Sequence, residues 1–236
     1  MSLLGSMSQA ELMGYLVRLI IIFLILPIHE FAHAWTAYKL GDDTAKYQGR
    51  LTLNPIAHLD PTGAICLMIG GFGWAKPVPI DPTRFTRKRS MRFGVAITAL
   101  AGPLSNLIVA FLGMIGLRVF RCSDYYNSYW DQYIAGEAIS NAPDIIYSML
   151  YAFVTINIGL AIFNLVPIPP LDGSKILSYF TSANVDRWFI RNEQIVRIVF
   201  LILLVTPILH GPLNFVEGKV FDLFTLLTNW IPALMG

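Results

Sequence analysis

The sequence has few cysteines and few charged residues. Only Cys66 and Cys122 are present, and the charge pattern described below assigns their segments to opposite sides of a membrane. Two such cysteines build neither a disulfide framework nor a zinc ribbon, so both are interpreted as incidental. Charged residues make up 14% of the 236 residues against 55% apolar residues, and the mean hydropathy is +0.58. This balance excludes an ordinary soluble domain and indicates an integral membrane protein.

Internal repeats, low-complexity tracts and an appended soluble domain are also absent from the sequence. No basic region precedes a short apolar core at the amino terminus, so the first apolar stretch is expected to be a retained span and not a signal peptide. We expect a single membrane-embedded domain over residues 1–236, with a core at about 12–180 and C-terminal helices at about 195–235. The net charge of +2 says little about partners, and no nucleic-acid partner is expected.

Apolar stretches set the predicted fold class. Four of them are long enough to cross about 30 Å of hydrocarbon: residues 12–38, 93–119, 143–169 and 195–210. A fifth, 213–235, contains Asp222 and Pro232 and is compatible either with a span or with a helix in the interface. The prediction is an all-α polytopic membrane protein with four to five transmembrane helices.

The connection between the first two spans is expected to associate with the membrane without crossing it. Residues 64–75 are apolar but too short to span, and their glycines weaken a helix, which favours a re-entrant or interfacial segment. Residues 47–54 alternate in polarity and residues 77–80 carry proline at every second position, so both suit edge strands or extended chain. The basic run 84–92 suits either an anchor on anionic lipid or ordinary loop charge.

The distribution of Lys and Arg predicts the orientation. Nine of the 17 lie between residues 39 and 92 and four more between 175 and 197, so these segments should face the cytoplasm. Residues 121–141 carry acidic residues and a tyrosine-rich run and should face outward. The first and third spans then both descend toward the cytoplasmic side.

Residues 29–33 read His-Glu-Phe-Ala-His and lie inside the first predicted span. On a helix, His29 and His33 share one face and can bind one metal ion, while Glu30 can reach an adjacent water, a pattern typical of zinc peptidases. Each ionisable side chain at membrane depth costs about 2.5 to 3.5 kcal/mol, so three in one turn need a compensating cation. A chance match is therefore improbable in a lipid-embedded helix.

A hydrolytic zinc site needs a third protein ligand, and the best candidate is Asp172. It ends the proline-rich run 164–173, which terminates the third span on the same side as the histidine pair. The alternative is that Asp172 only caps a helix beginning near Lys175. At 1.5 Å per residue the histidines lie about 9 to 15 Å below the cytoplasmic boundary, so the site is submerged.

Other polar residues have structural alternatives. Asn164 and Asn106 can each serve as an interhelical hydrogen-bond donor, and for Asn106 this packing interpretation is favoured. His58 is either a further polar group near the site or a structural loop histidine, while His210 falls on the predicted outer side and is set aside.

These residues resemble the site-2 protease family of intramembrane zinc metalloproteases. His29–His33 matches its HExxH motif, and residues 164–173 fit its NxxPxPxLDG motif at every fixed position. The resemblance covers about residues 20–180 and extends to features of the compact bacterial branch at residues 49–55, 60–63, 73–79 and 101–106. The chain departs from other members in lacking a PDZ or CBS insertion.

The resemblance implies one zinc ion per chain, with His29, His33 and Asp172 as ligands. It also implies Glu30 as general base and acid and Asn164 as a group that stabilises the oxyanion or orients the substrate. The implied activity is cleavage of transmembrane-protein substrates within the lipid bilayer. The implied location is a bacterial cell membrane, in a multi-pass protein with its active site toward the cytoplasm.

Three other functions are weighed against this one. A transporter or channel would use the intramembrane His, Glu and Asp side chains as a proton or ion relay, and tightly bound stoichiometric zinc separates the two functions. A di-iron oxygenase needs more His and Glu ligands than the four histidines and Glu30 supply. A catalytically dead scaffold is disfavoured because every expected catalytic residue is present. The natural substrate, the trigger for cleavage and the oligomeric state stay open.

Overall fold

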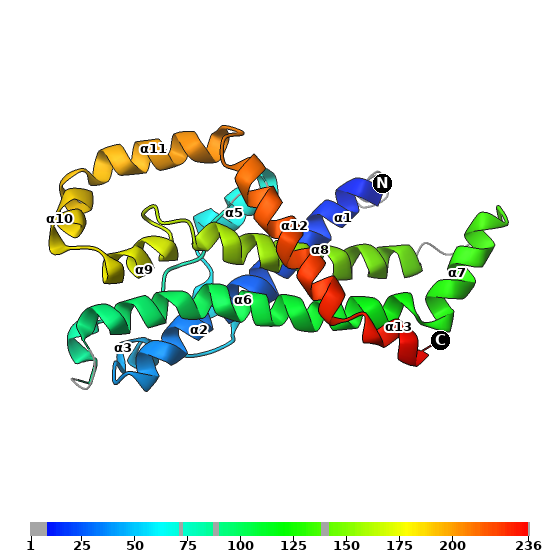
Figure 1. Ribbon diagram of the computed structural model, residues 1–236, viewed down its shortest axis with the longest axis horizontal. Helices are drawn as coiled ribbons and strands as arrows, with labels where there is room; N and C mark the ends of the chain where they lie inside the picture. Colours follow the sequence, from blue (N-terminus) through cyan, green and yellow to red (C-terminus); the bar gives the residue numbers. More distant parts are fainter. Residues whose placement is uncertain (1–8, 71–72, 87–89, 138–141, 236) are drawn as a thin grey trace.

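The computed structural model describes residues 9–70, 73–86, 90–137 and 142–235, and its regular structure in these ranges is helical (Figure 1). This confirms the predicted all-α class. Three helical stretches are long and apolar enough to cross a membrane: Met13–Lys39, Met91–Arg121 and Ala142–Asn164.

The first span is not a uniform α-helix. It consists of α1 (Gln9–Ile20), a π-helical turn η2 (Ile21–Ile25) and α2 (Leu26–Lys39). Pro27 lacks the N–H that would bond to the carbonyl of Phe23, so a regular α-helical ladder cannot continue through this point. The irregularity at this point is the π turn, which ends directly before α2.

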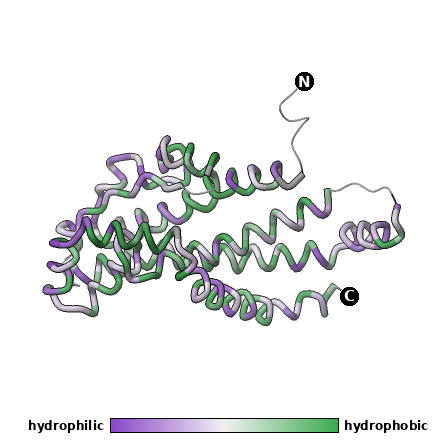
Figure 2. Tube along the Cα trace, turned by 90° about the horizontal axis from the view of Figure 1, so that it is seen from above, coloured by the Kyte–Doolittle hydropathy of each residue, from purple (hydrophilic) through white to green (hydrophobic). Residues whose placement is uncertain are grey.

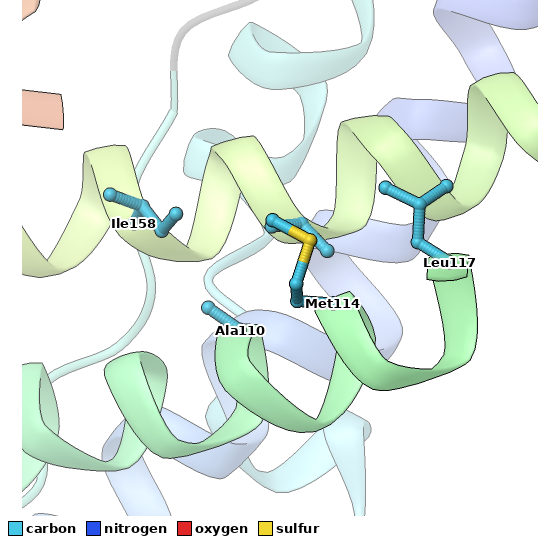
Figure 3. Close-up of a cluster of buried hydrophobic side chains, with 5 residues drawn as sticks. Ala110, Met114, Leu117 and Ile158 are labelled. Atoms are coloured by element: carbon cyan, nitrogen blue, oxygen red, sulfur yellow. The ribbon is translucent and has the colours of Figure 1, made fainter. Parts of the chain in front are cut away.

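Helix α6 (Met91–Arg121) is the centre of the molecule, and α8 (Ala142–Asn164) and α2 pack along it (Figure 1). The Ser90 side chain caps the start of α6 by accepting a hydrogen bond from the Phe93 amide. An apolar cluster joins α6 to α8 (Figure 3), and its buried members are Ala110, Met114, Leu117, Val154 and Ile158.

The outer face of α6 is apolar as well. Leu100, Leu104, Ile108 and Leu112 recur every four residues and are 40%, 48%, 53% and 60% exposed. A continuous exposed apolar stripe on a helix of this length fits contact with lipid. Hydrophilic residues instead gather toward the two ends of the molecule, at the end farthest from the termini and in the helix Asp124–Ile134 at the other end (Figure 2).

The connection between the first two spans contains short helices and irregular chain: α3 (Thr44–Tyr47), α4 (Pro55–His58), α5 (Pro61–Gly70) and the 3-10 turn η3 (Pro82–Arg84). No strand occurs among the described residues, and only Leu59 and Ala75 form an isolated antiparallel bridge. Of the two predicted alternatives, edge strands are therefore wrong at both segments: residues 48–54 form turns and irregular chain, and residues 76–80 form non-helical chain that agrees with the extended alternative. Pro77 and Pro79 lack the N–H groups that a longer ladder requires.

The apolar segment 64–75 forms most of α5, whose ten residues rise about 15 Å and cannot cross a bilayer. Arg18 of α1 donates to the Met68 carbonyl near the end of α5 and ties this helix to the first span. Residues 71–72, and residues 87–89 of the basic run 84–92, lie outside the described ranges.

The remaining helices precede or follow α8 in the chain. Helix α7 (Asp124–Ile134) follows α6, and after α8 the chain forms α9 (Asp172–Phe180), α10 (Ala183–Arg191), α11 (Glu193–Val205), α12 (His210–Leu227) and α13 (Trp230–Met235). The fourth predicted span coincides with α11, which rises only about 20 Å over 13 residues. The fifth is divided between α12, which packs on α8, and α13. Membrane crossing by these last helices stays a prediction.

Candidate metal centre

Two histidines of α2 and one aspartate of α9 meet at a buried point against α6. His29, His33 and Asp172 are 5%, 6% and 5% exposed. The Nε2 atoms of the two histidines lie 3.1 Å apart, and Asp172 Oδ2 lies 3.3 Å from His29 Nε2 and 3.1 Å from His33 Nε2. The structure thus brings together residues that are separated by about 140 positions in sequence.

The sequence explains how Asp172 reaches the histidines. Helix α8 ends at Asn164, and the proline-rich segment after it returns the chain so that α9 begins at Asp172 itself. A Cβ atom on Gly173 would collide with the Leu165 carbonyl, so glycine is required where the chain doubles back. The cap residue of α9 is Leu171, and it makes no side-chain cap bond. Asp172 is therefore not the cap of a helix that starts near Lys175.

The outer nitrogens of both rings are held by α6. His33 Nδ1 lies 2.7 Å from the Thr98 carbonyl oxygen, which only accepts, so Nδ1 carries the hydrogen. His29 Nδ1 lies 3.0 Å from Asn106 Oδ1, which assigns the same tautomer to His29. The Nε2 lone pairs of both rings are then directed to the point where Asp172 Oδ2 lies. Ring orientation of this kind is characteristic of metal-ligating histidines.

The carboxylate is also oriented. Lys175 Nζ lies 3.0 Å from Asp172 Oδ1, which leaves Oδ2 to the histidines. With the Lys175 ammonium beside it, Asp172 is a carboxylate. Its Oδ2 and the two Nε2 lone pairs are then three acceptor atoms in mutual contact, and they need protons or a cation between them.

The size of the cluster fits zinc. Tetrahedral zinc with bonds of about 2.0 to 2.1 Å places its ligand atoms about 3.3 Å apart, and the three separations here are 3.1, 3.1 and 3.3 Å. Gly102 of α6 faces the same point. A Cβ atom there would lie 2.5 Å from His33 Cε1 and 2.7 Å from His29 Cε1, so glycine keeps this side of the cluster open.

The two predicted catalytic residues have different surroundings. Glu30 Oε2 accepts a hydrogen bond from the Val78 amide at 3.1 Å, so the extended chain at residues 76–80 lies against it. Asn164 Nδ2 donates to the Leu160 carbonyl of its own helix at 2.9 Å. The geometry places Asn164 on α8, which ends one short loop before Asp172, but its amide is engaged in its own helix and not with the three candidate ligands.

Sequence reasoning missed two partners of the histidines. For Asn106 the packing interpretation was favoured, yet its side chain contacts His29. The Thr98 carbonyl carries no sequence signal, because any residue supplies one. His58 is 1% exposed and bonds Thr52 and Arg50 within the loop, as the structural interpretation predicts. His210 begins α12 and does not belong to the cluster.

A membrane-spanning helix carrying a histidine pair, joined by a carboxylate from beyond a later span, defines the class of membrane-embedded metallopeptidases. The family model described as Peptidase family M50 matches residues 17–207. The chain belongs to this family, which is the site-2 protease family.

Curated relatives agree with this assignment. The chain is 41% identical to a Bacillus subtilis protein named "Putative zinc metalloprotease YwhC" over 92% of this chain and 94% of that protein. It is 28% identical to "Putative zinc metalloprotease Rip2" of Mycolicibacterium smegmatis over 78% of this chain and 65% of that protein. It is 25% identical to "Zinc metalloprotease MJ0392" of Methanocaldococcus jannaschii over 68% and 33%. No solved structure matches the chain.

Proposed function

We propose that this protein is an intramembrane zinc endopeptidase that hydrolyses peptide bonds within transmembrane helices of membrane-protein substrates. The observation that supports it most strongly is the triangle of His29 Nε2, His33 Nε2 and Asp172 Oδ2, with edges of 3.1 to 3.3 Å. Its two histidines lie on a helix long enough to span a membrane. Three protein ligands leave a fourth tetrahedral position for water or substrate, as hydrolytic zinc sites require.

Each residue has a role in the proposed reaction. His29, His33 and Asp172 hold one zinc ion per chain, which supplies a Lewis acid that polarises a carbonyl and lowers the pKa of a water molecule. Glu30, beside His29, takes the proton from the attacking water and passes it to the leaving amine. Asn164 is the candidate donor to the developing oxyanion, because its Nδ2 carries a second hydrogen besides the one donated to the Leu160 carbonyl.

The proposed substrates follow from the surroundings. An intact transmembrane helix hides its carbonyls in backbone hydrogen bonds, so a substrate must unwind locally before a carbonyl can reach the site. Substrates with helix-weakening residues near the cut should be preferred. The exposed apolar stripe of α6 supports a location in the bilayer, and the basic loop residues support a site that faces the cytoplasmic side. A bacterial cell membrane is proposed because a relative with 41% identity is bacterial.

The test uses the full chain in lipid nanodiscs. The probe is a synthetic peptide with about 20 apolar residues and Gly-Asn-Gly at its centre, and a matched peptide carries Leu at those three positions. Zinc is measured by elemental analysis and cleavage by mass spectrometry. We expect one zinc per chain and faster cleavage of the Gly-Asn-Gly peptide.

Three variants assign the roles. Glu30→Gln should keep zinc and lose cleavage, whereas Asp172→Asn should lose zinc as well. Asp222→Asn, at a carboxylate on α12 with a 73% exposed side chain, is the matched control and should behave like the unaltered protein. Normal cleavage by Glu30→Gln would remove Glu30 from the mechanism, and weakly bound zinc in the unaltered protein would favour an ion relay.

A further inference from the structure

Arg50 is a buried cation that the proposed chemistry leaves unexplained. It is 5% exposed, and no carboxylate among the described residues lies within ion-pair distance of it. Its Nε is buried without a hydrogen-bond partner. A buried charge that is incompletely paired is costly, so its retention calls for a role other than packing.

A helix end directs Arg50 inward. At the end of α3, the Gly49 amide bonds to the Lys46 carbonyl and the Arg50 amide to the Ala45 carbonyl at 2.7 Å. This is the pairing of a Schellman motif, and it needs the left-handed conformation that Gly49 adopts at φ +67°. The side chain that follows Gly49 is therefore placed by backbone geometry.

Arg50 and His58 together hold the backbone of Lys76, which lies in the segment that follows α5. The Arg50 Nη2 atom donates to the Lys76 carbonyl, and the Lys76 amide donates to the His58 carbonyl at 2.9 Å. His58 Nε2 lies 2.8 Å from the Thr52 carbonyl and must carry the hydrogen, so Nδ1 is an acceptor, 3.5 Å from Arg50 Nη2. Both backbone groups of Lys76 are thus fixed by this loop.

Two residues beyond Lys76, the chain reaches the candidate general base. The Val78 amide donates to Glu30 Oε2 at 3.1 Å. Because Pro77 and Pro79 have no N–H, Val78 supplies the only backbone donor in this part of the segment. The hydrogen bond from the Val78 amide to Oε2 orients the Glu30 carboxylate. A general base needs only one oxygen for the proton, and that oxygen is then Oε1.

We propose that Arg50 and His58 are positioning residues that hold segment 75–78 so that the Val78 amide orients Glu30 for proton transfer. This inference rests on the proposed function, because it concerns the group that activates water. The electrostatics agree: burial lowers the pKa of Arg50, and the negative charge of Glu30 opposes that shift. The positive charge of Arg50 therefore also acts on the Glu30 carboxylate, which the loop containing Arg50 orients.

The first test is independent of cleavage. Hydrogen–deuterium exchange is followed by mass spectrometry in the zinc-loaded protein, using overlapping fragments across residues 74–81. Pro77 and Pro79 contribute no amide, which isolates the Val78 signal. Arg50→Met and Glu30→Ala should each accelerate Val78 exchange by at least about tenfold, whereas Arg84→Met, at an exposed arginine of the same connection, should not. Unchanged exchange in Arg50→Met would overturn the inference.

The second test uses the peptide probe. Arg50→Met should keep one zinc and lower kcat by about 10- to 100-fold with a smaller change in KM, the range seen when an outer partner of a metal site is lost. Arg50→Lys keeps the charge and a donor and should recover part of kcat. If Arg50→Met does not fold, Val78 exchange and peptide cleavage are both measured on Arg50→Lys, with a smaller effect expected in each.

A double variant distinguishes positioning from general damage. Val78→Pro removes the amide in a segment already rich in proline, and Val78→Ala keeps the amide and should lose far less kcat. Both substitutions act on the hydrogen bond between the Val78 amide and Glu30 Oε2. The double variant Arg50→Met/Val78→Pro should therefore lose no more kcat than the worse single variant. Losses that multiply would refute the inference, whereas normal cleavage by Glu30→Gln would remove Glu30 from the proposed mechanism and leave the exchange result standing.

Discussion

One face of α6 serves two different purposes along its length. Thr98, Gly102, Asn106, Ala110 and Met114 recur every four residues and are all buried, so they form one continuous buried stripe that turns slowly around the helix and is called its buried face. The first three contact or adjoin the histidine pair, whereas the last two belong to the apolar cluster with α8. The same helix face therefore changes from a metal-supporting surface to an ordinary packed core within one turn.

The two halves are stabilised differently. The apolar half depends on close packing, where loss of volume is the main cost. The polar half depends on hydrogen-bond partners, and it leaves Thr98 Oγ1 and Asn106 Nδ2 buried without one. Substitutions in the polar half should thus change zinc affinity, and those in the apolar half should change stability alone.

The largest effect on zinc affinity is expected from Gly102→Ala. A methyl group would enter the space beside both histidine rings, and we expect affinity to fall by about 100-fold or more, beyond the effect of losing an outer partner. Gly113→Ala is the matched control in the apolar half, since its Cβ would meet the Phe153 ring edge at 2.9 Å. Zinc competition with a chelator measures both, and equal affinity in the two variants would contradict the distinction.

Asn106→Leu should lower zinc affinity by about 10- to 100-fold, because His29 loses the group that orients its ring. Asn157→Leu is its control, on α8 between Val154 and Ile158 of the apolar cluster. Asn157 is also buried, but its amide donates to the Phe153 carbonyl of its own helix. Affinity should be unchanged in that variant, and a comparable loss there would show that any buried asparagine matters.

Lys175→Met should have a small effect on zinc. The Lys175 side chain is 49% exposed, so its pair with Asp172 is expected to contribute only about 0.2 to 1 kcal/mol, or up to about fivefold in affinity. Chelator competition at low and high salt provides the measurement. A loss that is independent of salt and exceeds about tenfold would mean that Lys175 fixes the carboxylate more rigidly than its exposure suggests.

Met114→Ala should leave zinc affinity unchanged. Met114 is 1% exposed within the cluster of Figure 3, and its truncation should lower the free energy of unfolding by about 2 to 5 kcal/mol. Thermal unfolding in nanodiscs, with zinc measured on the folded fraction, gives both quantities. Loss of zinc at unchanged stability would show that the two halves of α6 are coupled.

The sequence was sufficient to predict the all-α class and to select His29, His33 and Asp172 for the cluster that the structure assembles. Helical spacing predicts that the histidines share a face, and the common direction of the first and third spans predicts that Asp172 can join them. Both arguments depend on regular geometry. They succeed because the spans are long and apolar.

Irregular chain was less predictable. Between the first two spans, edge strands or extended chain were predicted, and no strand formed among the described residues. At residues 77–80 prolines at alternate positions prevent a ladder. The Thr98 carbonyl and the Val78 amide arise from backbone positions that depend on tertiary contacts. No pattern of side chains encodes them, so the supports of the site had to come from the structure.

The π turn at Ile21–Ile25 has a consequence for the first span. Such a turn holds one more residue than an α-helical turn, and each residue turns a helix by about 100°. Everything after it is therefore rotated relative to an uninterrupted helix that starts at Gln9. Arg18 can thus face α5 while His29 and His33 face α6, although a helical wheel drawn through the whole span would assign these directions differently.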